Sequence, residues 1–466
     1  MKVAQPNIIL IIMDSVGAKR CSAYGHYRET TPGLARIAAE GLLYRHCFAP
    51  APWTLPSHVS LFSGLYPAQH GCINAEGEFP GNYYVLPKIL QQAGYRTLGI
   101  SSNLAISRRY NFHTGFDYFL EMETLFNTDR HQELRQSIRS RMDSLRGNLD
   151  EVRLIFQTAF ENKYYSYPFK HLVDRIYRQY WGNILKKSYH ATERSLCLAK
   201  KFIKQNRRGP FFIFINFMEC HVTYNPPPRF RNALTMGEKE DTPLQLLYEQ
   251  EIAYLDDRLF NLYTFIEHLG LKDDTMFIVT ADHGEGFGEH GHQGHFFCIY
   301  NEQIHIPLII KYPAALNLTG ESTHLVQLHD LFATLLEITG APLPAPESSR
   351  SLLDPGRDFA LVENLDTSFL VRRLSSRTRP PDYTQPCISL IDAELHKLIK
   401  WTDGRRELYN LKEDYGETTN LLEDPAYQAQ ALSLQQQLAE VSVPLPEGAA
   451  PWPPPDLNPP EEHEPA

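Results

Sequence analysis

The sequence predicts an α/β protein in which a mostly parallel central sheet lies between two layers of helices, followed by a small C-terminal α+β subdomain. Three observations support this fold class. Apolar runs of strand length recur along the chain, helical patterns separate the first of them, and two of these runs end in side chains that can bind a metal ion. The 466 residues, 42% of them hydrophobic, are enough for one large domain and a smaller one.

The N-terminal part alternates strands with helices. A buried strand is expected over residues 7–13, and a helix over Thr31–Glu40 begins at Thr31-Pro32, where the first helical turn tolerates proline. A second helix, Leu86–Ala93, ends at Gly94 and precedes a strand at Thr97–Ile100. This spacing is typical of parallel βαβ units. Three further buried strands are expected, at residues 211–217, 276–281 and 306–310.

Residues 126–210 differ from their surroundings, because they are helical in pattern, basic and rich in Tyr and Phe. From Asp129 to Arg208 there are 18 Lys and Arg against 8 Asp and Glu, a net +10 inside a chain of net −10. These charges can be ordinary solvated helix faces. They can also form a cap over the active site that attracts an anionic substrate.

The C-terminal part shows two short apolar strands, Leu398–Trp401 and Glu407–Leu411, and a helix is expected around residues 427–440. We therefore divide the chain into a catalytic α/β domain (1–384) that carries the 126–210 insertion, a small subdomain (385–442), and a tail (443–466). The tail is rich in Pro and Glu and is expected to be disordered.

Composition limits the function classes. The net charge of −10 argues against a nucleic-acid partner, and no stretch approaches the roughly 18 apolar residues that span a membrane. The seven cysteines form no CxxC pair, which indicates reduced thiols and a cytoplasmic protein. The apolar run 7–13 is too short for a signal peptide. The oligomeric state stays open.

Two predicted strands end in metal-type ligands. The first strand stops at Asp14, and the run 276–281 stops at Asp282-His283. Ligands bind beyond the carboxyl ends of parallel strands, and carboxylate and imidazole are common metal ligands. One shared metal site is therefore expected, although either aspartate alone could be a helix cap.

A hydroxyl residue, Thr54, stands near the start of a helix that ends near Gly64. Pro56 fits the first turn of this helix, so Thr54 lies beside converging backbone N–H groups that suit a phosphate or sulfate. It can be a simple N-cap, or a nucleophile activated by a metal ion.

These residues belong to a series of motifs that resembles the sulfatase family in content and order. The motifs are Asp14 after the first strand, Thr54-Leu55-Pro56-Ser57-His58, Leu65-Tyr66-Pro67 with His70-Gly71, Gly115-Phe116-Asp117, Asp282-His283-Gly284-Glu285, Gly288-Glu289-His290-Gly291, and Leu408-Tyr409-Asn410-Leu411 with Gly416-Glu417. The resemblance covers roughly residues 7–120 and 211–425. It implies an alkaline-phosphatase-like three-layer fold and a metal-dependent hydrolase or transferase.

Departures from the family pattern concern the residues that hold sulfate. Sulfatases oxidise the Cys or Ser of this motif to formylglycine, an aldehyde that Thr54 cannot form because of its β-methyl group. The family arginine is replaced by His58, the second N-terminal aspartate by Ser15, and the Lys-Trp-His segment by Ser102-Asn103-Leu104. The lysine that the family carries before its Tyr-Glu is replaced by His295.

The replacements resemble the metal site of phosphoethanolamine and phosphoglycerol transferases, in which Thr is the nucleophile. That resemblance implies that Asp14, Thr54, Asp282 and His283 bind one divalent metal ion (Zn, Mn, Mg or Ca). It also implies that His221 and His295, with Glu219, bind a second ion or the substrate and take part in catalysis. Ser57, His58 and Asn103 are expected to line the substrate pocket. His290 and His292 are expected to be ordinary loop residues.

The predicted function is therefore metal-dependent cleavage of a small anionic phosphoester or phosphonate ester through Thr54. One alternative is a sulfuric ester hydrolase that works without formylglycine. Another is a metal-binding relative without catalytic activity.

Overall fold

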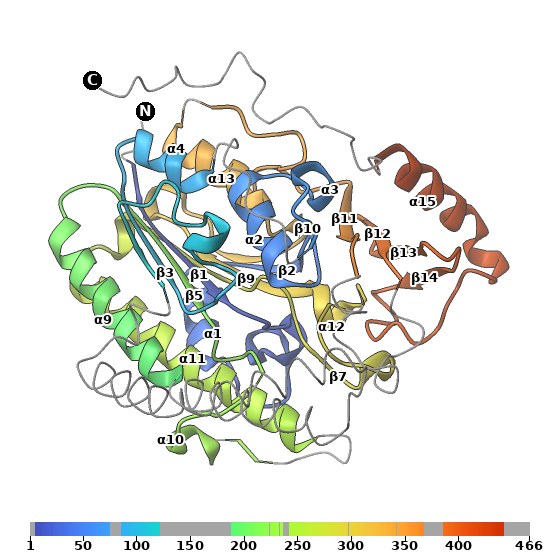
Figure 1. Cartoon of the computed structure of the whole chain (residues 1–466), viewed down its shortest axis with the longest axis horizontal. Coiled ribbons are helices and arrows are strands. Elements are labelled where there is room, and N and C mark those ends of the chain that lie inside the picture. The colour runs from blue at the N-terminus through green and yellow to red at the C-terminus, as the bar shows by residue number, and fades with distance from the viewer. Residues whose placement is uncertain are drawn as a thin grey trace, which may run out of the picture.

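A mixed eight-stranded sheet lies between two helical layers, and a smaller antiparallel sheet adjoins it (Figure 1). The computed structural model describes residues 5–74, 85–121, 188–222, 224–232, 234–235, 242–296, 298–341, 343–367 and 385–441. This architecture confirms the α/β fold class, the alkaline-phosphatase-like three-layer arrangement and the small C-terminal α+β subdomain.

The strands of the large sheet follow the order β10-β2-β9-β6-β1-β5-β3-β4. Their bounds are β1 Asn7–Met13, β2 Leu42–Phe48, β3 Arg96–Ser101, β4 Tyr118–Leu120, β5 Phe211–Phe217, β6 Thr275–Thr280, β9 His305–Lys311 and β10 Gly320–Gln327. β1 pairs in parallel with β5 and β6, and all three are buried along their whole length. Burial on both faces explains why these strands are continuous apolar runs.

The strand predicted at residues 306–310 is β9, and it runs antiparallel to both of its neighbours, β2 and β6. Its first residue therefore lies at the edge of the sheet where β1, β3, β5 and β6 end. Side chains that follow those strands and side chains that precede β9 meet at this edge.

Helices cover both faces of the large sheet. In Figure 1, α2, α4 and α13 lie above the sheet and α1, α9 and α11 lie below it. The helix bounds are α1 Pro32–Ala39, α2 Thr54–Ser63, α3 Pro67–His70, α4 Leu86–Gln92, α9 Ser188–Asn206, α10 Pro228–Arg231, α11 Pro243–His268, α12 Asn301–Ile304 and α13 Asp330–Thr339. Short 3₁₀ turns are η1 Ala18–Arg20, η2 Ser22–Tyr24, η3 Arg108–Tyr110, η5 Lys272–Asp274, η6 Glu289–Gly291, η7 Ala314–Leu316 and η8 Pro425–Tyr427.

The C-terminal sheet has the order β11-β12-β13-β14 and packs against one long helix, α15. The bounds are β11 Phe359–Asn364, β12 Cys387–Asp392, β13 His396–Trp401, β14 Arg406–Asn410 and α15 Gln428–Val441. The two predicted strands and the helix are present. However, β11 precedes residue 385, where we had placed the boundary, because a strand distant in sequence completes the sheet. A two-stranded hairpin, β7 Gly286–Phe287 and β8 Gln293–Gly294, lies in the loop after β6.

A buried ion pair inside the C-terminal subdomain also bonds to the loop that precedes β9. Lys397 Nζ lies 2.6 Å from Glu417 Oε1, and both side chains are fully buried. Lys397 also donates to the carbonyl oxygen of Ile299, and the backbone N–H of Asn301 donates to Glu417 Oε2, each over 2.6 Å. The subdomain is thus fastened directly to the loop that contains α12.

Two sequence expectations lie mainly outside the described residues. The basic insertion is described only from residue 188 onward, as α9, and the tail 443–466 is not described. All seven cysteines are described and are free thiols. Among the described helices, none has both the length and the apolar character that a membrane span requires.

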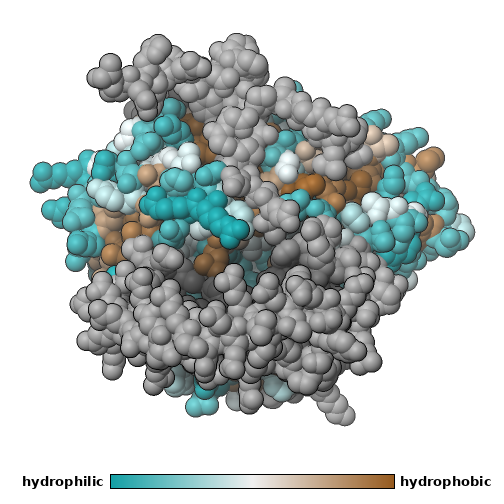
Figure 2. Space-filling view, in the orientation of Figure 1, coloured by the Kyte–Doolittle hydropathy of each residue, from teal (hydrophilic) through white to brown (hydrophobic). Residues whose placement is uncertain are grey.

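The visible described surface is largely hydrophilic, with smaller hydrophobic areas between (Figure 2). The exposed large apolar side chains among the described residues are scattered over several segments: Tyr27, Leu104, Tyr118, Val222, Leu244 and Leu432.

Candidate active site

Four side chains predicted to share a metal site do come together at the carboxyl edge of the large sheet. Asp14 follows β1, Asp282 and His283 follow β6, and Thr54 is the first residue of α2. The ligand atoms of Asp14, Asp282 and His283 all lie within 4.8 Å of one another, and these three side chains are fully buried. The expectation that two distant strands build one site is met by this geometry.

The imidazole of His283 directs a lone pair toward this cluster. Its Nδ1 lies 2.9 Å from the carbonyl oxygen of Gly284, which can only accept a hydrogen bond, so Nδ1 carries the proton. Nε2 then faces Thr54 Oγ1 at 3.2 Å and the Asp282 Oδ2 atom at 3.4 Å. The Thr54 hydroxyl therefore donates to His283 Nε2, an atom placed for metal binding.

Thr54 is not an N-cap. Trp53 occupies the N-cap position, and Thr54 stands one residue further into α2 than the sequence suggested. Its side chain, 6% exposed, is therefore not used to satisfy the helix end. It lies at the positive end of the helix, where an anion is favoured.

Amide and backbone N–H groups hold the two aspartates. Asn103 Nδ2 donates to Asp14 Oδ2 over 2.6 Å, and Asn216 Nδ2 donates to the same oxygen over 3.2 Å. Asp282 Oδ1 accepts from the backbone N–H groups of Ser15 and His283, over 3.2 and 3.0 Å. Ser15 adopts φ 63°, a left-handed conformation that directs its N–H into the site. Asn103 thus positions a carboxylate rather than lining an open pocket.

The two carboxylates have opposite pKa shifts. Burial raises the pKa of Asp282, and the nearby charge of Asp14 raises it further. Burial also acts to raise the pKa of Asp14, but electrostatic interactions with the His283, His221 and His58 imidazoles outweigh it, and the pKa lies below its usual value. Two buried carboxylates this close ionise together only at a cost, which a cation relieves.

The residues present fit a divalent cation. Asp282 Oδ2 accepts no hydrogen bond from the described residues, although it is buried beside His283 Nε2 and His58 Nδ1. Two carboxylates, one imidazole nitrogen and one hydroxyl form a set rich in oxygen donors, which suits Mg²⁺, Ca²⁺ or Mn²⁺ and also accommodates Zn²⁺.

His58 and Ser57 lie beneath Thr54 instead of facing a substrate. His58 Nδ1 donates to the carbonyl oxygen of Thr54 over 2.9 Å, and the fully buried ring packs edge-on against Phe112 and Phe214. Ser57 donates to the carbonyl oxygen of Ala51 over 2.9 Å. Both expected pocket residues therefore fix the start of α2, because the phase of the helix turns them inward.

His295 enters the site beside His283, with a ring centroid separation of 4.4 Å. Its Nδ1 lies 3.1 Å from Glu285 Oε1, and the Tyr224 hydroxyl donates to the other oxygen of that carboxylate over 3.2 Å. The buried Nε2 of His295 has no hydrogen-bond partner among the described residues. Burial, with electrostatic interactions from His283 and His221, holds the pKa of His295 well below its usual range, so the imidazole is neutral and its Nε2 lone pair is open.

The expected second metal site of His221, His295 and Glu219 is not assembled. The His221 and His295 rings meet edge-on at 5.0 Å, but Glu219 turns away to accept a short hydrogen bond from Thr192 in α9. Burial raises the pKa of Glu219 to about 7. Within the described residues, no set of three ligand atoms close enough to share an ion includes any of these side chains.

Sequence reasoning missed Asn216 and assigned no role to Glu285. Asn216 is the one amide in the apolar run 211–217 and holds Asp14, so a polar residue at the end of a buried strand was the available signal. Glu285 orients His295, and burial raises its pKa to about 7. The sequence shows Glu285 two residues after His283, but it does not show that His295 is its partner.

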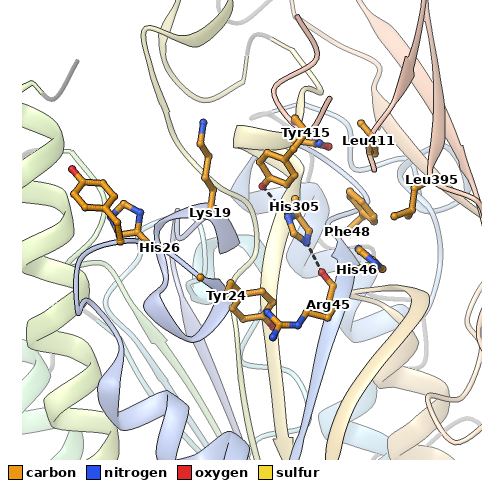
Figure 3. A pocket seen from close by; sticks show the side chains of 13 residues that line it. Lys19, Tyr24, His26, Arg45, His46, Phe48, His305, Leu395, Leu411 and Tyr415 are labelled. Carbon is orange, nitrogen blue, oxygen red and sulfur yellow. Dashed lines mark hydrogen bonds between the residues drawn. The ribbon is translucent and has the colours of Figure 1, made fainter. Parts of the chain in front are cut away.

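A separate cavity of about 440 Å³ lies between the loop after β1, the end of strand β2 and the C-terminal subdomain. Figure 3 shows His305 between Tyr415 and Arg45, and its two ring nitrogens lie 2.8 Å from the Tyr415 hydroxyl and from the Arg45 carbonyl oxygen. Arg45 is in turn paired with Glu321. His305 and Arg45 thus have partners of their own, and the cavity shares no lining residue with the cluster around Thr54.

Comparison with known proteins agrees with the site. The sequence model of the family described as Sulfatase matches residues 6–341, and that described as N-sulphoglucosamine sulphohydrolase, C-terminal, matches residues 288–443. The chain is 24% identical to an N-acetylgalactosamine-6-O-sulfatase of Bacteroides thetaiotaomicron, with 90% of this chain and 89% of that protein covered. It is 24% identical to human arylsulfatase D, over 73% of this chain and 66% of that protein.

Solved structures show the same fold. A phosphonate monoester hydrolase of Agrobacterium radiobacter superimposes with a TM-score of 0.67 at 17% identity, covering 93% of this chain and 95% of that chain. A protein in complex with its substrate D-glucosamine-2-N,6-O-disulfate superimposes with a TM-score of 0.64 at 18% identity, covering 94% and 97%. With the family match over residues 6–341, these findings establish that the chain belongs to the sulfatase family, a family of metal-dependent hydrolases in the alkaline phosphatase superfamily.

Proposed function

We propose that this protein hydrolyses a phosphoester or phosphonate ester through a covalent intermediate on Thr54. The observation that carries the proposal is the position of Thr54 Oγ1, which lies at the start of α2 and 3.2 Å from His283 Nε2, beside Asp14 and Asp282. A hydroxyl in this position faces the place where an anionic ester is favoured, and a cation bound beside it would promote loss of its proton to solvent.

The reaction proceeds in two displacements at phosphorus. The Thr54 oxygen forms a bond to phosphorus while the ester oxygen leaves and takes up a proton. Water then attacks the phosphorus of the phosphothreonine, and the Thr54 oxygen leaves. Thr54 regains its proton, and the phosphate or phosphonate is released. His295 is neutral and its Nε2 is open, so it can accept a hydrogen bond from this water and orient it for the attack.

A divalent ion held by Asp14, Asp282 and His283 with Thr54 would lower the pKa of the hydroxyl and offset the charge of the phosphoryl oxygens. The residues of the chain prepare that place: Asn103 and Asn216 fix Asp14, and the Ser15 N–H fixes Asp282. His58 holds the carbonyl of Thr54 and thereby the direction of its side chain.

The choice of phosphorus over sulfur depends on the same residues. Thr54 cannot become formylglycine, and a sulfothreonine lacks the aldehyde route by which sulfatases release sulfate. The family carries cations at the positions of His58, Asn103 and His295. Here His58 positions Thr54, Asn103 positions Asp14, and His295 presents a neutral nitrogen. A sulfate ester is the second candidate substrate, because the curated relatives are named as sulfatases.

The decisive experiment compares matched nitrophenyl phosphate, phosphodiester, phosphonate and sulfate esters in the presence of Mg²⁺, Mn²⁺, Ca²⁺ or Zn²⁺. We expect kcat/KM for a phosphorus ester to exceed that for the sulfate by at least about tenfold, which is about 1.4 kcal/mol of barrier. Chelation should abolish turnover, and Asp282→Asn should have the same effect. Faster sulfate cleavage, with Thr54 unmodified by mass spectrometry, would refute the phosphorus assignment.

Two further proposals concern the setting of this activity. The seven free thiols support a cytoplasmic location, where cysteines stay reduced. The net charge of +10 over residues 129–208 supports an anionic substrate, since that segment raises the local concentration of anions.

A further inference from the structure

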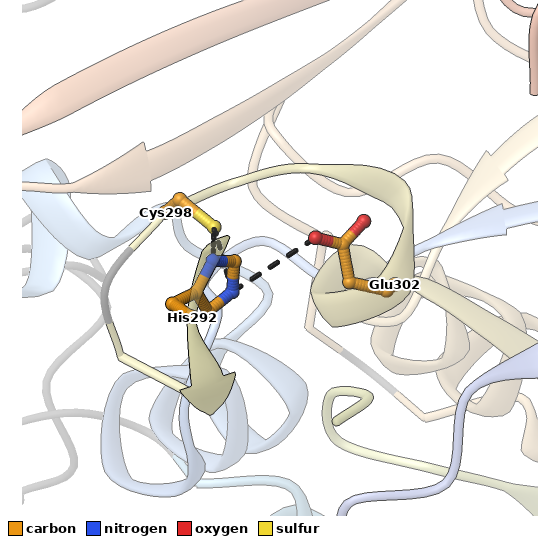
Figure 4. Close-up of side chains that lie close together, drawn as sticks. All are labelled: His292, Cys298 and Glu302. Atoms are coloured by element: carbon orange, nitrogen blue, oxygen red, sulfur yellow. Dashed lines mark hydrogen bonds and ion pairs between the residues drawn. The ribbon is translucent and has the colours of Figure 1, made fainter. Parts of the chain in front are cut away.

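A second group of metal-type ligands is buried in the loop between β6 and β9, outside the cluster around Thr54. It consists of His292, which precedes β8, Cys298, and Glu302 in α12. One ligand atom from each lies within 4.8 Å of the other two, and none of the three side chains is more than 7% exposed. Figure 4 shows the thiol and the carboxylate on either side of the imidazole, both directed toward it.

The distances suit a tetrahedral ion. Zinc–sulfur bonds of about 2.3 Å and zinc–nitrogen or zinc–oxygen bonds of about 2.0 Å place sulfur and nitrogen about 3.5 Å apart, and nitrogen and oxygen about 3.3 Å apart. Here Cys298 Sγ lies 3.3 Å and Glu302 Oε1 lies 3.9 Å from His292 Nε2. The sulfur–nitrogen distance thus matches a shared ion, and the nitrogen–oxygen distance exceeds the tetrahedral value by about 0.6 Å.

Gln303 supplies a fourth donor. Its Nε2 lies 2.6 Å from His292 Nε2 and 3.3 Å from Cys298 Sγ, while its Oε1 is buried without a hydrogen-bond partner among the described residues. A half-turn of the amide would place the oxygen where the nitrogen now lies, beside both ligands. The exchange gives up the three hydrogen bonds that Nε2 donates, to His292 and Cys298, whose atoms would face the ion instead, and to the carbonyl oxygen of Gly294.

The carboxylate ligand already has the outer support that metal sites use. His290 Nδ1 lies 2.8 Å from Glu302 Oε1, and the His290 ring stacks on Tyr300 with centroids 3.7 Å apart. His290 holds φ 51°, which is rare for a residue other than glycine and needs firm surroundings. The surrounding structure thus holds His290 in a strained conformation, in which its ring is bonded to Glu302.

We propose that His292, Cys298 and Glu302, with the Gln303 side chain, bind a zinc ion that is distinct from the ion beside Thr54. Thiolate and imidazole ligands select zinc over Mg²⁺ or Ca²⁺, whereas the oxygen-rich cluster around Thr54 does not. Cys298 binds as the thiolate, so its S–H proton passes to solvent as the sulfur–zinc bond forms.

The position of the site in the sequence gives it a structural task. His295 lies midway between His292 and Cys298, three residues from each. An ion held by those two residues closes a short loop around His295 and limits how far its open Nε2 can move. The proposed zinc site is thus a positioning device for His295.

Cobalt substitution of the full-length protein tests the proposal. Co²⁺ in this site should give a thiolate-to-cobalt absorption band in the near ultraviolet, at one equivalent per chain. The band should disappear in Cys298→Ser and persist in Cys387→Ser, which alters another buried cysteine. It should also persist in Asp282→Asn, which damages only the ion site beside Thr54.

A second measurement keeps the test valid if Cys298→Ser fails to fold. Zinc in the wild-type protein, counted by elemental analysis, should be released when a mercurial reagent titrates the thiols. A wild-type protein that shows no cobalt–thiolate band, or a band that survives in folded Cys298→Ser, overturns the proposal. Either result leaves the Thr54 chemistry untouched, because Asp282→Asn reports on that site separately.

Discussion

Thr54 combines two properties that helices seldom offer at one residue: a position in the first turn and a side chain not engaged in capping. Its Oγ1 contacts His283 Nε2, while Trp53 takes the N-cap position. Thr54→Ala should therefore lower kcat by at least about a thousandfold, while it changes the free energy of unfolding by about 1 kcal/mol or less. Steady-state kinetics with matched urea unfolding curves measures both quantities.

Thr54→Ser is the control, because it keeps the hydroxyl and removes only the methyl group. It should retain measurable turnover and form a covalent phosphoserine that can be trapped in acid. Normal turnover by a correctly folded Thr54→Ala protein would contradict the covalent mechanism.

The residues that sequence could identify are those that follow strands. Asp14, Asp282 and His283 stand where apolar runs stop, so their meeting at one edge follows from a parallel sheet. The roles of Ser57 and His58 could not be read in this way, because the rotation of α2 decides which side chains face inward. Asn216 was missed since an amide inside an apolar strand gives no pattern of its own.

At the scale of elements, α11 is the largest feature that sequence reasoning missed. Its buried face carries Glu249, Glu251 and Asp256 among apolar residues, which interrupts the stripe that identifies a helix. These acids have partners elsewhere: Asp256 accepts from the backbone N–H groups of Gly33 and Leu34 at the start of α1. α11 is therefore defined by polar contacts with distant segments that sequence periodicity does not reveal.

Glu249 tests this interpretation of α11. It pairs with Arg28 at 2.5 Å and with Arg20 at 3.5 Å, both from the loop after β1. Burial acts to raise the pKa of Glu249, but the hydrogen bond and charge of His26, with Gln245 and Arg28, outweigh it and lower the pKa. Glu249→Gln leaves Arg28 buried without its counter-charge and should cost about 3–5 kcal/mol of unfolding free energy at pH 7.

The pH dependence has a definite sign. A carboxyl with a lowered folded pKa stabilises the protein above its unfolded pKa, and this contribution is lost as the pH falls through the folded value. The difference in unfolding free energy between wild type and Glu249→Gln should therefore shrink between about pH 5 and pH 3. Urea unfolding at a series of pH values measures it, and a difference that stays constant with pH would show that the charge is not responsible.

At the scale of the whole molecule, the buried Lys397–Glu417 pair of the C-terminal subdomain also bonds to the backbone of Ile299 and Asn301 in the loop before β9. Glu417→Gln leaves a fully buried ammonium without its counter-charge and should destabilise the protein by about 3–5 kcal/mol. The double variant Lys397→Met with Glu417→Gln removes both charges and should recover much of this loss. Unfolding monitored by tryptophan fluorescence compares the three proteins, and a double variant no more stable than Glu417→Gln would contradict the account.

The fold class could be predicted from the order of strands and helices, whereas the membership of β11 in the small sheet could not. β11 pairs with β12 across residues 368–384, which are not described, and nothing in Phe359–Asn364 indicates which sheet it joins. Pairing between strands distant in sequence depends on the three-dimensional arrangement, so the boundary at residue 385 missed it.

The reversed direction of β9 has a consequence for how such proteins diversify. Because β6 ends and β9 begins at one rim of the sheet, the polypeptide between Thr280 and His305 departs and returns without crossing the barrier of packed strands. A change in the length of this loop would therefore leave the strand order unchanged, while Asp282 and His283 stay fixed at the end of β6. The loop can thus reshape the surroundings of the site without moving the carboxylate and the imidazole that the sheet holds.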